Sequence, residues 1–425
     1  MVRLLKNVLL VLALLLVWGA LLFFGMLDGW WHEPLTQSTD PDAFFTAARQ
    51  KIEKAKAGGV VMAMMEKGVV HEEFSSSPDQ TVDRNTAFQV ASLSKWVTAW
   101  GVMALVAEGR LDLDTPVNDY LNRWKLPTGA FDNDEVTVRR LLSHTAGLTD
   151  GLGYAGFLPG TPVQSLEESL TQAADASPGA DGEVKVGLPP GSTWKYSGGG
   201  YTLLQLLIEE VSGQSFEAYM QTVVFQPLGM SHSTFVWDDA RRSNLAKFYD
   251  KEGVIAPHLR YTALAATSLY TSLNDMELFV RAHFEGSNGE PAGRGVLDQR
   301  TIDQIKTPHA YQMGAAIWGL GTMLYASNNQ NDYIIGHDGK NEPLINTAVR
   351  LDPSTRDGVI ILAMGSPLLA TEIGSEWVFW KTGNVDTLLF MTLIAPTIAW
   401  FGIGSLLIVV VVVLVTVARR KASPN

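Results

Sequence analysis

A serine and a lysine stand three positions apart in the apolar stretch QVASLSKWVTAW, residues 89–100. If this stretch is helical, Ser92 and Lys95 lie side by side, because residues three apart share one helix face. Burial disfavours the ammonium form, so a lysine placed here tends to be neutral. A neutral amine beside a hydroxyl is a base beside a nucleophile. The alternative is a structural lysine that reaches solvent from the end of a core helix, and the pair alone does not decide.

Other motifs with chemical associations are less persuasive. GLGYAG, residues 151–156, matches G-x-G-x-x-G but follows no strand and opens no apolar helix, so we expect no dinucleotide site. Lys-Thr-Gly at 381–383 is interpreted as the end of a helix, and His144 as a residue that organises a loop. The eight histidines show no paired ligand spacing, so we expect no metal and no cofactor.

The elements that must position the pair can be predicted from periodicity and end signals. Ser92 is expected to open a helix that runs to about Glu108 and ends at Gly109. Before it, Asp40 and Pro41 predict the start of a helix, and residues 59–74 predict a hairpin around Lys67-Gly68.

The later part of the chain alternates between helical and strand patterns. We expect a short helix within 136–148, an irregular segment at 149–193 that lines a cleft, and an amphipathic helix at 200–213. Four apolar runs near the end predict consecutive antiparallel strands. The order predicts an α+β domain in which helices pack on an antiparallel sheet.

Both ends of the chain are strongly apolar. Residues 7–27 and 388–418 contain no charge, and each is long enough to cross a bilayer as a helix. We favour a retained anchor over a cleaved signal peptide for the first, because no small-residue cleavage site follows it. Pro396 predicts a kink or a partly interfacial start in the second.

Charges beside these segments predict their orientation. Arg3 and Lys6 precede the first segment, and residues 419–421 are Arg-Arg-Lys. By the positive-inside rule both termini are cytoplasmic, and the central domain is outside, at the plasma (inner) membrane. We therefore predict an N-terminal transmembrane anchor (1–31), a catalytic domain (32–385), and a C-terminal transmembrane segment with a basic tail (386–425). A net charge of -12 argues against nucleic-acid binding.

Three motifs in order give the chain a family resemblance: Ser92-Leu93-Ser94-Lys95, then Tyr196-Ser197-Gly198 in GSTWKYSGGGY, then His337-Asp338-Gly339 in YIIGHDGK. The chain resembles the penicillin-binding-protein and class C β-lactamase-like family of serine hydrolases over residues 40–380. VTVRRLLSHTAGL and AATSLYTSLNDMELFV look like further family segments. The resemblance implies a β-lactamase/transpeptidase-like fold, in which an all-helical subdomain accompanies an antiparallel sheet flanked by helices.

The resemblance also implies roles for these residues. Ser92 would form the acyl-enzyme, and Lys95, partly neutral, would take or relay its proton. Tyr196 would protonate the leaving group and activate water, which requires a phenol pKa below 10, with a nearby lysine ammonium as the natural cause. The backbone N–H groups of Ser92 and Lys340 would form the oxyanion hole. Gly339 would let the strand approach the substrate closely.

Two positions depart from the family pattern. The resemblance implies that Gly198, His337, Asp338 and Gly339 bind substrate. Gly198 stands where the family has an asparagine that binds a substrate carbonyl, and Asp338 replaces a threonine or serine that helps bind a carboxylate. We expect Asp338 to repel carboxylates or to read a substrate amine, and His337 to act as a weak cation or hydrogen bonder held by Asp338. These changes favour an esterase or amidase acting on a small-molecule or peptide-like acyl substrate. The alternatives are a penicillin-binding D-alanyl-D-alanine carboxypeptidase or β-lactamase, and a catalytically inactive membrane-tethered binding module.

Overall fold

An antiparallel sheet of eight strands is the centre of the structure, a computed structural model that describes residues 2–238 and 244–421. The strands follow the order β2-β1-β12-β11-β10-β9-β8-β7, so the first strands of the chain complete a sheet made mainly by its last part. The strands are β1 (Val60–Glu66), β2 (Val69–Ser76), β7 (Ala310–Gln312), β8 (Ala315–Trp318), β9 (Met323–Ser327), β10 (Tyr333–Asn341), β11 (Ile345–Asp352) and β12 (Asp357–Met364). Two short pairs are separate: β3 (Phe88–Gln89) with β6 (Tyr270–Thr271), and β4 (Phe248–Tyr249) with β5 (Ile255–Ala256).

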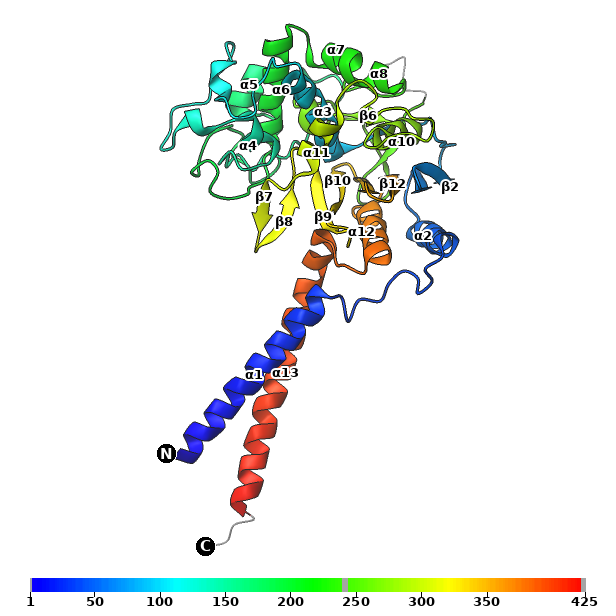
Figure 1. Cartoon of the computed structure of the whole chain (residues 1–425). Helices are drawn as coiled ribbons and strands as arrows, with labels where there is room; N and C mark the ends of the chain where they lie inside the picture. Colours follow the sequence, from blue (N-terminus) through cyan, green and yellow to red (C-terminus); the bar gives the residue numbers. More distant parts are fainter. Residues whose placement is uncertain (1, 239–243, 422–425) are drawn as a thin grey trace.

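Helices cover both faces of this sheet, and most of them gather on one side of it as a helical subdomain (Figure 1). The longer ones in the domain are α2 (Pro41–Ala55), α3 (Ser94–Ala107), α6 (Gly198–Ser212), α10 (Leu273–Arg281), α11 (Gln299–Lys306) and α12 (Leu369–Thr382). The short ones are α4 (Val138–Leu142), α5 (Leu166–Gln172), α7 (Phe216–Met220), α8 (Gln226–Leu228), α9 (Leu264–Thr267), single 3₁₀ turns at Ala91–Leu93, Val117–Asp119 and Asn133–Glu135, and a π turn at Gln221–Phe225. The predicted α+β fold with a helical subdomain is confirmed.

Alternation along the strands divides the core into two layers. Val61 and Ala63 on β1 face the helical subdomain, whereas Met62 and Met64 face α2 and α12. Because neighbouring side chains on a strand point to opposite faces, consecutive residues of one motif can belong to different layers. This alternation decides which motif residues can reach the candidate site.

The local end signals work as the sequence predicts. Asp40 caps α2 by accepting from the Asp42 N–H, and Pro41 is its first residue. Lys67 and Gly68 both adopt positive φ in the β1–β2 turn, as a two-residue hairpin requires. The helix predicted from Ser92 instead begins at Ser94, after a 3₁₀ turn that contains Ser92.

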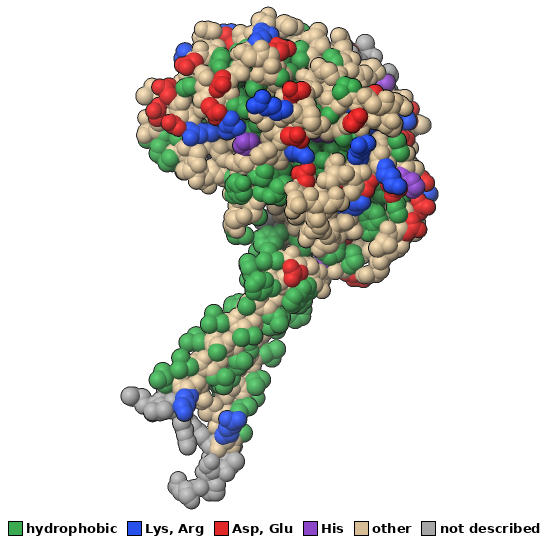
Figure 2. Space-filling view, viewed as in Figure 1, with side chains coloured by type: hydrophobic (Ala, Val, Ile, Leu, Met, Phe, Trp, Pro, Cys, Tyr) green, Lys and Arg blue, Asp and Glu red, His purple; other side chains and the backbone are tan. Residues whose placement is uncertain are grey.

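Two long helices, α1 (Val2–Leu27) and α13 (Thr387–Lys421), extend from the domain side by side (Figure 1). Spans within them, Leu5–Leu27 and Thr387–Arg419, are long and apolar enough to cross a membrane. Asn7 Nδ2 donates to Thr416 Oγ1 at 3.0 Å, so the helices are antiparallel, and Pro396 lies inside one continuous helix. In Figure 2 hydrophobic side chains cover both helices.

Candidate active site

Ser92 lies in a strained turn at the entrance to α3. The preceding residue, Ala91, has a left-handed backbone (φ 47) although it carries a side chain, and it is buried. The turn is held on one side by Thr347, whose Oγ1 donates to the Val90 carbonyl at 3.0 Å. Ser92 itself is half-buried, so its hydroxyl sits at the edge of the core.

Gly339 brings β10 against this turn. A Cβ on Gly339 would lie 1.9 Å from the Val90 carbonyl oxygen, so only glycine fits. The close approach that Gly339 permits in this structure is to the Val90 carbonyl, and its approach to a substrate stays a prediction. It also places Lys340, the next residue, on the strand that packs against the turn containing Ser92. An oxyanion hole made of the Ser92 and Lys340 N–H groups stays a prediction.

Lys95 is buried directly beside Ser92. Its Nζ lies 3.2 Å from Ser92 Oγ and donates to the Ala266 carbonyl at 2.6 Å, and only 2% of the residue is exposed. Burial lowers the pKa of Lys95 to about 7, against an opposing effect from the Asp150 carboxylate. About half of the amine is therefore neutral at neutral pH and can accept a proton.

Tyr196 lies beside the same lysine, with Lys95 Nζ 5.0 Å from the centre of its ring. Burial raises the pKa of Tyr196 well above 10, and a hydrogen bond with Ser92 only partly offsets this. The lowered phenol pKa expected from the sequence is wrong. Burial of the phenol outweighs any stabilisation of a phenolate by the half-neutral lysine, so Tyr196 remains a neutral phenol.

A polar network behind Tyr196 fixes the start of α6. Ser197 caps the helix, donates to Asp150 Oδ1 at 2.5 Å, and donates its backbone N–H to His144 Nδ1 at 3.2 Å. The His144 ring lies 4.4 Å from that of Tyr196, which agrees with the loop-organising role predicted for this histidine. Asp150 was missed, because nothing in its local sequence shows that the irregular segment folds over α6.

Gly198 is the first residue of α6 and does not line the opening of the site. Its N–H donates to the Leu152 carbonyl at 3.1 Å, and a Cβ on Gly198 would lie 2.1 Å from that oxygen. The substrate contact expected at Gly198 is therefore wrong for this chain. The loop backbone occupies the space that an asparagine side chain would need.

His337 faces Ser92's side of the sheet and is neutral. It is 1% exposed, and its Nδ1–H donates to the Asp338 carbonyl at 2.6 Å, which leaves Nε2 as an acceptor without a partner in the described chain. Burial, followed by the charge of Lys95, lowers the pKa of His337 to about 3. The expected weak cation is therefore wrong, and the ring is available only as a hydrogen bonder.

Asp338 points to the opposite face of the sheet. Its carboxylate accepts from Tyr325 Oη at 2.9 Å and from Thr371 Oγ1 at 2.6 Å, and it pairs with the fully buried Arg350. The sequence-based expectation that Asp338 repels carboxylates or reads an amine is corrected by this position. Its side chain does not hold His337 either, since only its backbone carbonyl contacts that ring.

Aromatic side chains form one wall of the site. Trp318 from β8 lies 5.7 Å from Trp194, 5.8 Å from Tyr196 and 5.4 Å from His337, measured between ring centres. The rings of Trp318, Trp194 and Tyr196 pack with Ala310 and Ile317 in a small apolar cluster. The catalytic candidates are thus bordered by apolar surface rather than by charge.

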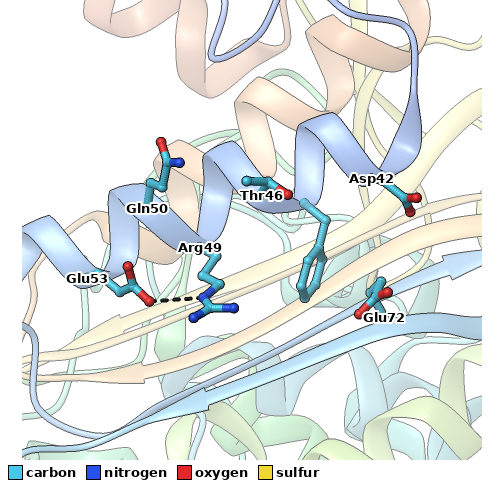
Figure 3. Close-up of a pocket in the computed structure, with 7 residues that line it drawn as sticks. Asp42, Thr46, Arg49, Gln50, Glu53 and Glu72 are labelled. Carbon is cyan, nitrogen blue, oxygen red and sulfur yellow. Dashed lines mark hydrogen bonds and ion pairs between the residues drawn. The ribbon is translucent and has the colours of Figure 1, made fainter.

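A hollow of about 310 Å³ lies elsewhere, between α2 and β2 (Figure 3). Most of its charged side chains already have partners: Arg49 pairs with Glu53 at 2.9 Å and Asp42 with His71 at 2.6 Å. It is on the α2 side of the sheet, away from Ser92, and none of the sequence motifs contributes to it. The candidate active site is therefore the region around Ser92.

Comparisons with known proteins show the family of the chain. A sequence model of the beta-lactamase family, "Beta-lactamase", matches residues 44–373. "Penicillin-binding protein 4*" of Bacillus subtilis (strain 168) is 31% identical over 185 residues, covering 43% of this chain and 38% of that protein. "Protein flp" of Staphylococcus aureus (strain MRSA252) is 23% identical over 65% of this chain and 52% of its own length. The chain thus spans about half or less of these curated relatives.

The fold also matches solved structures. The octameric penicillin-binding protein homologue from Pyrococcus abyssi superposes with a TM-score of 0.65 and 25% identity, covering 81% of this chain and 78% of that one. The structure of SurE gives a TM-score of 0.62 at 25% identity, over 79% and 74% of the two chains.

Proposed function

The chain belongs to the beta-lactamase family, and from this premise we propose a membrane-anchored serine hydrolase that works through an acyl-enzyme on Ser92. The observation that carries the proposal is the buried Lys95, whose amine has a pKa of about 7 and lies 3.2 Å from Ser92 Oγ. A structural lysine would keep its charge in solvent. This one is placed where a general base for Ser92 is needed.

In acylation, Ser92 Oγ attacks the acyl carbonyl carbon while its proton passes to neutral Lys95. The backbone N–H groups of Ser92 and Lys340 stabilise the oxyanion. Collapse of the intermediate breaks the bond to the leaving group. The leaving group takes a proton from the neutral phenol of Tyr196, which can in turn be reprotonated by Lys95. Water, deprotonated by the same pair, then releases the acid and restores Ser92.

We propose an ester or a neutral amide as the substrate. His337 is neutral, so β10 offers no imidazolium to a substrate carboxylate, and its free Nε2 accepts a hydrogen bond instead. The aromatic wall of Trp194 and Trp318 favours an apolar acyl or leaving group. This preference for an uncharged substrate does not depend on Asp338, whose side chain faces away from Ser92.

A penicillin-binding carboxypeptidase or β-lactamase is the second candidate, favoured by the names of relatives such as penicillin-binding protein 4*. A catalytically inactive tethered module is the third. Stable labelling of Ser92 by a fluorescent penicillin would favour the second over the esterase. Activity that is unchanged in Ser92→Ala would favour the third.

We place the domain outside the cytoplasm, at the plasma (inner) membrane. Leu5–Leu27 and Thr387–Arg419 would both cross the bilayer. Arg3 and Lys6 lie at the start of the first span, and Arg419, Arg420 and Lys421 lie at the end of the second, so basic residues would mark the cytoplasmic ends of both.

The test of the proposed activity is hydrolysis of p-nitrophenyl acetate by the full chain in detergent, beside Ser92→Ala. We expect turnover that depends on Ser92. Equal rates in both proteins would contradict the proposal. As a control for folding, Ser143→Ala removes a serine hydroxyl that bonds only to Arg139 and Thr145, and should leave the rate nearly unchanged.

A further inference from the structure

The β7–β8 hairpin exposes an uncharged, apolar tip. Residues 310–323 contain no Asp, Glu, Lys or Arg. Tyr311 is 60% exposed and Met313, in the turn, is 82% exposed. Single exposed apolar side chains are ordinary, so the significance of this tip depends on where it lies.

The tip lies at the end of the sheet from which the membrane helices leave. Asn384, just before α13, donates to the Ser327 carbonyl at 2.8 Å, which fixes the β9–β10 turn beside the start of that helix. Because β7, β8, β9 and β10 run antiparallel in that order, the β7–β8 turn is at the same end. Figure 1 shows this hairpin directed toward the two helices, and hydrophobic side chains gather on that edge of the domain in Figure 2.

Two aromatic residues just beyond α1 lie at this same end of the domain, where the membrane helices leave it. Trp30 is 59% exposed and Trp31 is 47% exposed, and tryptophan beyond an apolar span is typical of the lipid–water interface. Gly29 packs against Phe379 of α12, so the base of the domain touches this level directly. An apolar hairpin tip beside that base would meet the outer headgroup region.

The other end of the hairpin is part of the active-site wall. Trp318, the last residue of β8, packs against Trp194 and Tyr196, and Ala310 and Ile317 complete the cluster. Apolar packing therefore connects the exposed tip to the phenol beside Ser92, without a charged residue of the hairpin between them.

We propose that the β7–β8 tip inserts into the interfacial region of the outer leaflet and that the site takes long-chain acyl esters presented by the membrane. This rests on the proposed anchoring and hydrolase activity. Ser92 Oγ would bond to the acyl carbon as the ester C–O bond breaks, and the alcohol would leave with a proton. The hydrocarbon chain would lie along the partly exposed Trp194, which Trp318 supports from behind, toward the hairpin.

The β4–β5 hairpin provides a matched control. Its Val254 and Ile255 are 60% and 55% exposed, close to the exposure of Tyr311. It lies at the opposite end of the sheet, because the Tyr249 carbonyl accepts from Leu344 in the β10–β11 turn at 2.9 Å. The two hairpins therefore differ in their distance from the helices and not in apolar exposure.

Insertion can be measured directly because the chain has no cysteine. Met313→Cys and Val254→Cys, each labelled with a nitrobenzoxadiazole fluorophore, are reconstituted as full chains in phosphatidylcholine–phosphatidylglycerol vesicles that contain a nitroxide-labelled phospholipid. We expect strong quenching at 313 and little at 254, whichever way the protein is oriented. Equal, weak quenching at both positions would overturn insertion.

Delivery of long-chain esters from the membrane to the active site is measured in the same vesicles, by comparing turnover of a long-chain and a short-chain ester. The ratio of p-nitrophenyl dodecanoate to p-nitrophenyl acetate turnover should fall about tenfold in Tyr311→Ser/Met313→Ser, and stay unchanged in Val254→Ser/Ile255→Ser. An unchanged ratio in the first variant would overturn delivery. If p-nitrophenyl acetate turnover does not depend on Ser92, the proposed function fails instead, while the quenching result still decides whether the tip inserts.

Discussion

Arg350 holds the carboxylate of Asp338 on the face of the sheet opposite Ser92. The guanidinium is fully buried, lies 3.6 Å above the Tyr325 ring, and stands 3.9 Å from Asp386, the residue before α13. The motif strand β10 is thus tied electrostatically to the start of the C-terminal helix. Asp338 serves the architecture of the site and not the recognition of its substrate.

Replacing Arg350 should destabilise the protein strongly. Arg350→Met leaves the partly buried Asp338 and the fully buried Asp386 without their cation, and breaking a buried pair in this way costs about 3–5 kcal/mol. The free energy of unfolding by denaturant, with the full chain in detergent, measures the loss. The exposed pair Arg49–Glu53 is the control, since Arg49→Met should cost less than about 1 kcal/mol; equal losses would show that the buried network is not needed.

Replacing Asp338 should not redirect specificity. Asp338→Asn weakens the pair with Arg350, so thermal stability falls, but the side chain does not reach the substrate. We expect the ratio of kcat/KM for neutral and carboxylated p-nitrophenyl esters to stay within about twofold of the wild-type ratio. A clear gain for the carboxylated ester would mean that Asp338 faces the substrate after all.

The rate should depend on pH through Lys95. The pKa of this amine is lowered to about 7, and only the deprotonated form accepts the Ser92 proton. We expect kcat/KM to fall about tenfold per pH unit below 7 and to level off above it. Tyr196 stays protonated across this range because its pKa is raised, so a falling alkaline limb near pH 8 would contradict the assignment.

Tyr196→Phe should slow the reaction without moving this pH limb. The variant keeps the ring beside Lys95 and His144 but loses the phenol proton for the leaving group. Positioned acid–base groups contribute about 10²–10⁴-fold, and we expect a loss in kcat/KM of that order. Rates that match the wild type would remove Tyr196 from the chemistry.

Restoring the family asparagine should harm this protein. Gly198→Asn would place its Cβ 2.1 Å from the Leu152 carbonyl, so we expect a loss of about 1–3 kcal/mol in stability and no gain in penicillin labelling. The same change at Gly109, where φ is 69 and no atom lies within 4 Å of an added Cβ, is the control. Asparagine tolerates that backbone, and a small cost is expected there.

Much of the framework was predictable because its signals are local. The Asp40–Pro41 helix start, the Lys67–Gly68 turn and the antiparallel strands depend on residues close together in the chain. The spacing of Ser92 and Lys95 likewise predicts their contact, since both lie within one turn of helix.

The errors concern contacts between distant segments. The Leu152 carbonyl fills the space beside Gly198, and Arg350 forms an ion pair with Asp338. Neither Leu152 nor Arg350 is adjacent in sequence to the motif that it contacts. The side of the sheet that Asp338 faces was readable from strand alternation once His337 is placed in the site. The raised pKa of Tyr196 could not be predicted from the sequence, because it depends on how completely the folded domain excludes water.

The acyl-enzyme is the central claim, and the most direct measurement is mass spectrometry of the full chain quenched in acid during turnover of p-nitrophenyl acetate. We expect one acetyl group, located by peptide mapping on Ser92, at a steady-state level that disappears in Ser92→Ala. Turnover without an acetyl group on Ser92, or an adduct that persists in Ser92→Ala, would contradict the account.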